Sequence, residues 1–258
     1  MEDFKFNKRW LSQFGGRIIG LPKIEIAKRQ FSTNQIPGRS KESYIDYGYY
    51  SNVEFERQIG LLSVIYGNTS DKLIESLIEW LTNSTGYCEF KDTQHKGMYT
   101  TAYLINISDV VRELRTYSTA TLKFSREAFW FLDSGKVELK YSAREAENGI
   151  NLINPYKFTA LPTIEIELSS SAHASFEILF NNQLQEFILN TTDKSERKVI
   201  IDFSKSLMFV DDINKKKYLD FDFEEARGLE NNNIITVKSN SDYTTINSVS
   251  IKPCWRRL

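Results

Sequence analysis

Side chains suited to acid–base or nucleophilic chemistry are sparse in this sequence. The chain has two histidines, His95 and His173, and neither lies at a spacing from serine, cysteine or carboxylate that is typical of a nucleophilic triad. Gly15 and Gly16 are not followed by the Lys-Ser/Thr pair of a phosphate-binding loop. A pair of glycosidase carboxylates is defined in space and leaves no sequence pattern. We therefore predict no catalytic residues, no cofactor and a protein that is not an enzyme.

Metal-ligating residue types are present, but not at the spacing of a known site. Asp220, Asp222 and Glu224 would share one face of a strand and could offer oxygen ligands to a hard cation. Their alternation with phenylalanine is also what a half-buried strand shows, and no EF-hand spacing is present. Cys88 and Cys254 lie far apart and outside any Cys/His cluster. We expect no metal site and two separate thiols.

The stretch of residues 36–55, IPGRSKESYIDYGYYSNVEF, has the densest turn chemistry in the chain. Pro37 presets φ for the second position of a turn and Gly38 tolerates a positive φ at the third, so the chain should reverse there. Tyrosine and arginine are enriched at protein interfaces but are also ordinary in strands and turns, so both roles stay open. The candidate interface residues are Ile36, Pro37, Gly38, Arg39, Tyr44, Tyr47, Tyr49 and Tyr50.

Composition and charge narrow the classes of protein. Hydrophobic residues make up 41% and aromatic residues 13% of the 258 residues, a balance that favours strands over helical bundles. The 33 basic residues nearly cancel the 34 acidic ones, so we expect no specific nucleic-acid binding. No apolar run approaches the ~20 residues that cross a bilayer, and the charged start MEDFKFNKRW does not resemble a signal peptide. We expect a chain that folds in the cytosol without a membrane.

Periodicity predicts the elements that must position these residues. NTSDKLIESLIEWLTNSTG has apolar residues at three- and four-residue spacing, which predicts a helix at about 71–83. Strand-like alternation occupies the first ~60 residues, including Ile24 and Ile26. The turn-rich stretch SAREAENGINLINPYKFTALP places a domain boundary near residue 142. Evenly spaced strands without helices follow, as in a β-sandwich or barrel. We predict a mainly β protein with domains at 1–142 and 143–258.

Several stretches together resemble the distal tail proteins of siphophages, the Dit family. Residues 36–53 resemble the Ile-Pro-Gly-Arg…Asp-x-Gly-x-Tyr-x-Asn segment of that family. The runs IEWLTNSTGYCEFKDTQHKGMYTTAY, NPYKFTALPTIEI, KVIIDFSKSLMFV and VSIKPCWRRL resemble its later segments in the same order. The positions that fill the first pattern are Ile36, Pro37, Gly38, Arg39, Asp46, Gly48, Tyr50 and Asn52.

This resemblance implies a structural role. It implies an N-terminal β-sandwich with one helix and a protruding hairpin, followed by a galectin-like β-sandwich. It implies homo-hexameric rings, single or stacked, at the virion tail tip, assembled in the cytoplasm of the bacterial host. The implied partners are the major tail or tube protein, a tail-associated lysin or fibre protein and a receptor-binding protein, with DNA passing through the lumen. The hairpin that belts adjacent subunits would lie in or next to residues 36–55.

Two rival readings remain from other classes. The first is a carbohydrate-binding adhesion module, in which the C-terminal sandwich contacts the bacterial cell wall. Galectins bind sugar through a His-x-Asn-x-Arg strand, whereas His173 is followed by ASFEI, which disfavours this reading. The second is an enzyme, which the lack of a recognisable nucleophile or metal spacing disfavours. A tail assembly protein therefore remains the first interpretation.

Overall fold

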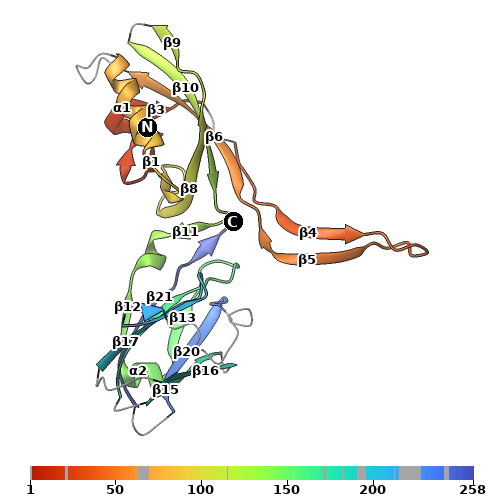
Figure 1. The fold of residues 1–258 in the computed structure, drawn as a ribbon, viewed down its shortest axis with the longest axis vertical. Helices are drawn as coiled ribbons and strands as arrows, with labels where there is room; N and C mark the ends of the chain where they lie inside the picture. The colour runs from red at the N-terminus through yellow and green to blue at the C-terminus, as the bar shows by residue number, and fades with distance from the viewer. Residues whose placement is uncertain are drawn as a thin grey trace. The chain divides into compact units, whose positions relative to one another are not determined.

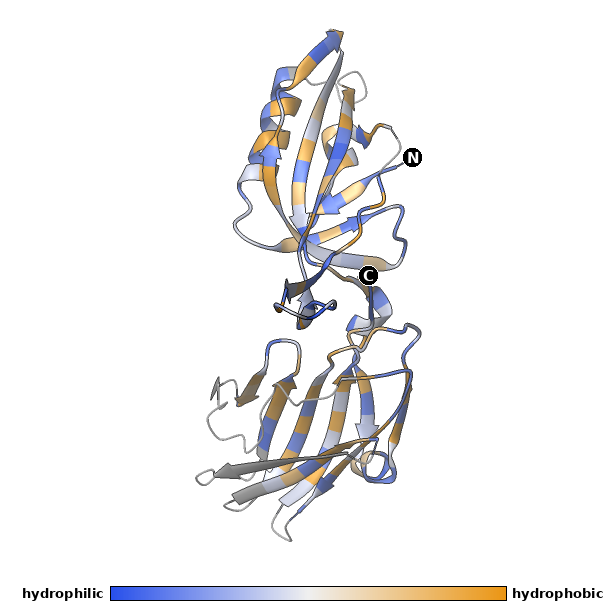
Figure 2. Ribbon diagram, turned by 90° about the vertical axis from the view of Figure 1, so that its right-hand side faces the viewer, coloured by the Kyte–Doolittle hydropathy of each residue, from blue (hydrophilic) through white to orange (hydrophobic). Residues whose placement is uncertain are grey.

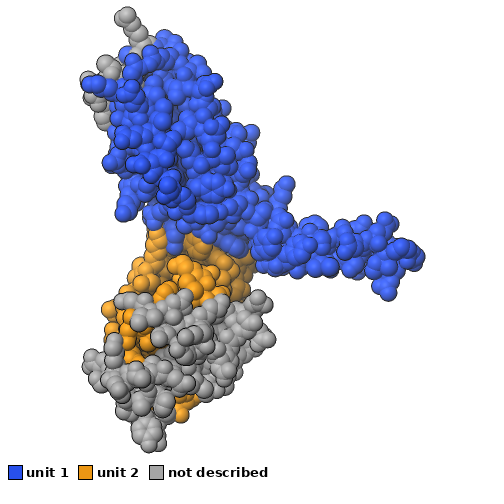
Figure 3. All heavy atoms as spheres, viewed as in Figure 1, with its two compact units in different colours: residues 1–130, 258 blue, residues 131–257 orange. Residues whose placement is uncertain are grey.

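The computed structural model confirms the mainly β class and divides the chain into two compact units. It describes residues 2–20, 23–62, 70–114, 116–170, 173–181, 183–190, 196–211, 213–214, 228–240 and 244–258. Unit 1 comprises residues 1–130 and 258, and unit 2 comprises residues 131–257 (Figure 3). Asp220, Asp222 and Glu224, which were considered as ligands of a hard cation, lie outside the described residues.

Unit 1 is built on one long sheet and a helix (Figure 1). The sheet has the strand order β2-β1-β7-β8-β10-β6-β3, and β9 pairs with β10 at one end. The elements are β1 (Phe4–Phe6), β2 (Arg9–Trp10), η1 (Leu11–Phe14), β3 (Gly16–Ile18), β4 (Arg29–Asn34), β5 (Ser43–Tyr50), β6 (Val53–Leu62), α1 (Ser70–Thr82), β7 (Cys88–Asp92), β8 (Met98–Ile107), β9 (Val111–Leu114) and β10 (Tyr117–Arg126).

Aromatic side chains fill the core of unit 1. Phe55 of β6 and Phe90 of β7 pack edge to face with ring centroids 5.2 Å apart, although two strands separate β6 and β7 in the sheet order. The sheet therefore curls over on itself. Phe4 and Phe124 add a further edge contact at 5.8 Å, and such pairs contribute beyond their buried area.

Helix α1 covers this core, as its spacing predicted. Leu73, Leu77, Trp80 and Leu81 are buried, whereas Ile78 of the predicted apolar face is exposed. The indole Nε1 of Trp80 donates a hydrogen bond to the Phe6 carbonyl at 3.0 Å, which ties the helix to β1. The described helix spans Ser70–Thr82, so the predicted range of 71–83 is confirmed to within one residue at each end. Neither described helix is long and apolar enough to span a membrane.

Unit 2 contains two antiparallel sheets around a common core of aliphatic and phenylalanine side chains. One sheet has the order β12-β21-β14-β17-β18-β19 and the other β13-β20-β15-β16. Hydrophobic and hydrophilic residues alternate along these strands (Figure 2), as expected where one face of a sheet is buried. The elements are η3 (Asp133–Lys136), β12 (Leu139–Ser142), α2 (Ala143–Asn148), β13 (Ile150–Ile153), β14 (Thr163–Ser170), β15 (His173–Phe180), β16 (Gln183–Asn190), β17 (Glu196–Asp202), β18 (Leu207–Val210), β19 (Ile213–Asn214), β20 (Asn232–Ser239) and β21 (Thr244–Lys252). Strands β11 (Trp130–Leu132), which begins at the last residue of the 1–130 stretch, and β22 (Arg256–Arg257) pair with each other outside these two sheets.

The compact units divide at residue 130, twelve residues before the boundary that the sequence predicts at 142. Strand β12 pairs with β21 and so belongs to unit 2. The turn-rich stretch that follows contains α2, a helix that the sequence analysis did not predict. Ser142 and Glu145 form a capping box at its start, with the Ser142 amide 2.8 Å from the Glu145 carboxylate. A helix of six residues is too short to show a 3.6-residue period, which is why the pattern gave no signal.

The expectation that Ile24 and Ile26 lie in a strand is wrong. Residues 23–28 are extended but belong to no sheet, and both isoleucine side chains are exposed. Alternation predicts which side chains share a face, and it cannot show whether a neighbouring strand is present.

The faces of α1 predict the cost of two substitutions. Leu77→Ala should lower the free energy of unfolding of unit 1 by about 2–5 kcal/mol, because it empties a fully buried site. Glu75→Ala, on the exposed face of the same helix, should change it little. Urea denaturation followed by circular dichroism measures both, and equal effects would contradict the assigned faces.

Candidate assembly surface

A two-stranded ribbon, here called the arm (residues 29–50), protrudes from unit 1 (Figure 1). Strand β4 pairs only with β5 among the described strands, and β5 only with β4. Their register places Asn34 opposite Ser43 near the tip and Arg29 opposite Tyr50 at the base. A two-stranded ribbon in water has no core of its own and is marginally stable at best. Local contacts and its attachment to unit 1 must therefore maintain it.

The tip of the arm is the turn that the sequence predicts. The Arg39 amide donates to the Ile36 carbonyl at 3.0 Å, which closes a four-residue turn. Gly38 has φ of 80°, a value that glycine adopts without a steric penalty at the third position of a type II turn. All four residues from Ile36 to Arg39 are exposed. The prediction of a sharp reversal at Pro37 and Gly38 is confirmed.

The arm contains an irregularity at Gly48. The register passes from Arg29 opposite Tyr50 to Phe31 opposite Asp46, so β5 carries two more residues than β4 between these pairs. Gly48 has φ of 75° within this insertion, and its amide donates to Asp46 Oδ1 at 2.9 Å. Such a bulge bends and twists a ribbon. The glycine of the Asp-x-Gly-x-Tyr pattern thus has a backbone role.

An ion pair braces the arm beside this bulge. The Arg29 Nε donates to Asp46 Oδ2 at 2.7 Å, and the Arg29 guanidinium lies over the Tyr50 ring at 5.6 Å. The hydrogen bonds from Arg29 and from the Gly48 amide lower the pKa of Asp46 below its ordinary value. Because the pair is exposed, its role is to fix geometry more than to add stability.

The arm displays aromatic side chains to solvent. Tyr44, Tyr47 and Tyr49 are each more than half exposed. The rings of Tyr47 and Tyr49 stack with centroids 6.3 Å apart despite the bulge between them, and Phe31 packs against Tyr44 at 5.0 Å. Such a surface has the aromatic composition of an interaction site. Phe31 and the exposed Ile45 extend it and were missed, although alternation along residues 43–50 pointed to Ile45.

Tyr50 differs from the other predicted interface residues. Its ring packs edge to face on Phe129 at 5.6 Å, in a small cluster with buried Ala27, Val53 and Ala128. Tyr50 is therefore part of the attachment of the arm to unit 1. The structure brings the remaining candidates together at the tip and along β5.

A buried cation anchors the segment that enters the arm. Arg57 of β6 is 3% exposed and pairs with Glu25 Oε1 at 3.3 Å and with Asp92 Oδ2 at 3.5 Å. Asp92 Oδ1 also accepts a hydrogen bond from the His95 ring at 2.8 Å, and that ring stacks on Trp130 at 3.9 Å. His95 lies in a turn, closed by the hydrogen bond from the Met98 amide to its carbonyl, and its side chain has a structural role.

The pKa of Asp92 reflects this network. Burial alone would raise it, but hydrogen bonds from the His95 side chain and amide and the charge of Arg57 outweigh burial, so the pKa lies below its ordinary value. Asp92 therefore stays ionised as the counter-charge of Arg57. Burial lowers the pKa of the Arg126 guanidinium to about 10. This guanidinium donates a hydrogen bond to the Ala128 carbonyl at 3.0 Å.

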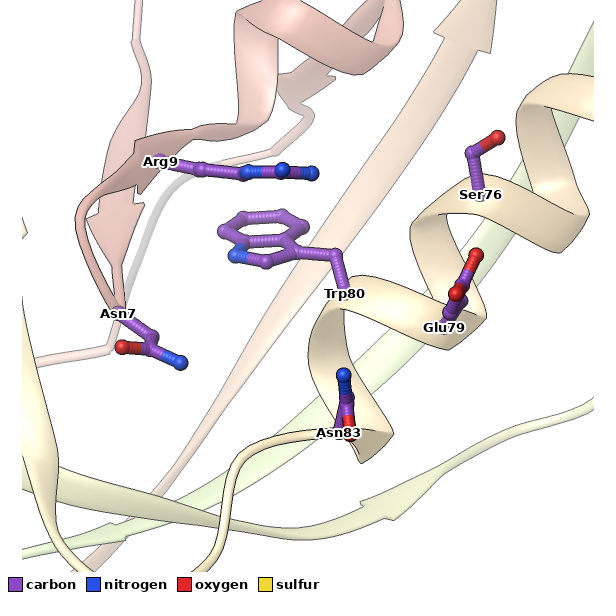
Figure 4. A pocket seen from close by; sticks show the side chains of 6 residues that line it. All are labelled: Asn7, Arg9, Ser76, Glu79, Trp80 and Asn83. Carbon is purple, nitrogen blue, oxygen red and sulfur yellow. The ribbon is translucent and has the colours of Figure 1, made fainter.

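A separate polar hollow of about 350 Å³ lies beside α1 (Figure 4). Its lining residues are Asn7, Arg9, Ser76, Glu79, Trp80 and Asn83. These six include no histidine or cysteine and only one carboxylate, so they do not form a nucleophile–base pair or a carboxylate pair. The hollow therefore gives no indication of catalysis.

Comparison with known proteins identifies the class of this chain. Residues 1–126 match the family model described as phage tail protein N-terminal domain. The crystal structure of the SPP1 Dit protein, described as a paradigm of the hub adsorption apparatus in phages that infect Gram-positive bacteria, is similar with a TM-score of 0.65 and 10% sequence identity. The match covers 97% of this chain and 97% of that one. No curated protein is significantly similar in sequence.

Residues 1–126 thus match a phage tail protein N-terminal domain, and nearly the whole chain has the fold of the SPP1 Dit protein. The resemblance inferred from the IPGR segment and its companions is confirmed. The family match of residues 1–126 indicates a structural role in a phage tail.

The ion pair beside the bulge predicts an acid titration. The Gly48 amide resonance should titrate with Asp46 at a midpoint below the ordinary 3.8, because the amide donates to that carboxylate. The pair is present at neutral pH and is lost as the pH falls through this lowered pKa. Arg29→Gln should move the midpoint upward. Nuclear magnetic resonance titration measures both, and a wild-type midpoint at or above 3.8 would refute the assigned pair.

Proposed function

We propose that this protein is a distal tail protein that assembles into a hexameric ring at the tail tip. The ring joins the tail tube to the tip or baseplate and anchors the tail-associated lysin or fibre protein and the receptor-binding protein. DNA passes through its lumen, and assembly takes place in the cytoplasm of the bacterial host. The chain has no enzymatic step of its own in this role.

The observation that supports this proposal most directly is the arm. It exposes Tyr44, Tyr47 and Tyr49 on a ribbon whose two outer edges pair with no other described strand. Exposed edges and aromatic patches are hazards that soluble proteins cover or pair. A cyclic ring covers them, because each copy gives its arm to one neighbour and receives the arm of the other. The candidate interface is therefore the tip residues 36–39 together with Tyr44, Tyr47 and Tyr49 of β5.

The charge of the chain suits a passage for DNA. Its formal net charge is −1, with acidic and basic residues almost equal in number. A lumen rich in lysine and arginine would neutralise phosphates and bind DNA strongly, which would obstruct its passage. A near-neutral chain avoids that cost.

A second candidate function has one observation in its favour. A polar hollow of about 410 Å³ lies on unit 2 and is lined by Glu167, Leu168, Arg197, Lys198, Asp211 and Asn247. Charged and amide side chains of this kind can bind the hydroxyl groups of a saccharide. Carbohydrate binding would make unit 2 an adhesion module. A glycan array tests this candidate, and retention of a bacterial wall polymer would support it.

Substitutions in the arm should separate folding from assembly. Tyr47→Ala and Tyr49→Ala should each weaken the ring by ~2 kcal/mol per contact while leaving the melting temperature of the monomer unchanged, because interface energy concentrates in exposed aromatic anchors. Tyr50→Ala should instead lower that melting temperature, because Tyr50 packs on Phe129. Circular dichroism melts and mass measurement by light scattering give the two quantities.

The control is Ile153→Ala, an exposed apolar truncation in unit 2. It should leave both mass and melting temperature unchanged. Intact rings from both tyrosine variants, or unfolded monomers, would argue against the arm as the assembly contact.

A further inference from the structure

Residues 23–28, here called the root segment, present two isoleucines to solvent just before the arm begins. Ile24 is 92% exposed and Ile26 is 75% exposed, whereas Ala27 of the same segment is buried. Such exposure of neighbouring β-branched side chains is unusual on a surface that stays in water. The segment therefore has the character of an interaction surface.

The root segment is fixed in place on its inner side. The Glu25 carboxylate pairs with buried Arg57 at 3.3 Å, and the Ser51 amide donates to the Lys28 carbonyl at 2.9 Å. Because Glu25 and Ala27 point inward in an extended chain, Ile24 and Ile26 must point outward. The isoleucines are thus held exposed by the anchoring of their neighbours.

The backbone of the root segment also resembles the edge strand of a sheet. Among the described residues, the Lys28 carbonyl of this segment accepts from the Ser51 amide and the Glu25 carbonyl accepts from the Arg126 guanidinium at 3.5 Å. An extended segment with unpaired amides and alternating apolar side chains can accept an added strand. The arm is a ribbon whose two strands each have one unpaired edge.

Charges favour a second copy of this chain as the occupant. The tip of the arm carries exposed Arg39 and Lys41. Strand β6, which carries the Arg57 anchor of the root segment, exposes Glu56 on its outer face, beside Glu54, which pairs with Lys123 at 2.6 Å. A head-to-tail ring needs two different patches on each copy, and the arm supplies one of them.

We propose that the root segment of one copy receives the arm of the next copy as an added strand. Ile24 and Ile26 pack against the exposed aromatic side chains of that arm. The arm tip brings its cations toward the carboxylates of β6. This inference rests on the proposed ring and names the surface of the neighbour that completes it.

A complementation experiment tests the pairing of these two surfaces. The root variant carries Ile24→Asp and Ile26→Asp, and the arm variant carries Tyr47→Asp and Tyr49→Asp. Each variant alone should be monomeric by light scattering with an unchanged melting temperature, since all four side chains are exposed. A one-to-one mixture should give heterodimers that grow no further, because it retains one intact arm and one intact root segment.

Other outcomes separate the inference from the proposed function. A root variant that forms the same oligomers as the wild type overturns the inference but not the proposed ring. The root segment would then be a contact surface for another tail protein. A mixture that stays monomeric also overturns it, because the two surfaces then belong to different contacts. A wild-type chain that is monomeric at every concentration tested overturns the ring as well. The control is Ile153→Asp with Ile234→Asp, two exposed isoleucines of unit 2, which should assemble normally.

Discussion

A two-stranded ribbon cannot bury a core, and this constraint governs the arm. Its order depends on the turn at Pro37 and Gly38, on the ion pair between Arg29 and Asp46, and on its attachment to unit 1. None of these covers the aromatic side chains of Phe31, Tyr44, Tyr47 and Tyr49, which stay exposed in the single chain. The same features that make the arm marginal alone make it suited to lie on another molecule, because its edges and apolar surface are still available.

The arm is attached through a small apolar cluster and a network of buried charge. Arg57 lies between Glu25 and Asp92, and Asp92 is in turn fixed by His95. Loss of one partner would leave an unpaired buried charge, which is strongly destabilising. The direction in which the arm leaves unit 1 is therefore tied to the core sheet, and a defined direction is what a ring of identical subunits requires of an arm.

Sequence patterns predicted the parts that depend on local chemistry. The helix over 71–83 and the turn at Gly38 follow from periodicity and from backbone preference, and both are confirmed. The parts that were missed depend on pairing in space: Ile24 and Ile26 alternate like a strand but lack a neighbour, and β12 joins unit 2 through β21. Helix α2 is too short for a period. The network of Arg57 and Asp92 joins residues 35 positions apart, which no spacing rule detects.

The central claim is that the arm is an ordered ribbon whose edges become paired only between subunits. Hydrogen exchange of the amides of residues 29–34 and 43–50 tests it most directly, with the dilute monomer compared with the assembled protein. We expect rapid exchange at the unpaired edge amides in the monomer and strong protection of the same amides after assembly. Equal exchange in both states would contradict the claim, because the arm would then make no contact that depends on a second copy.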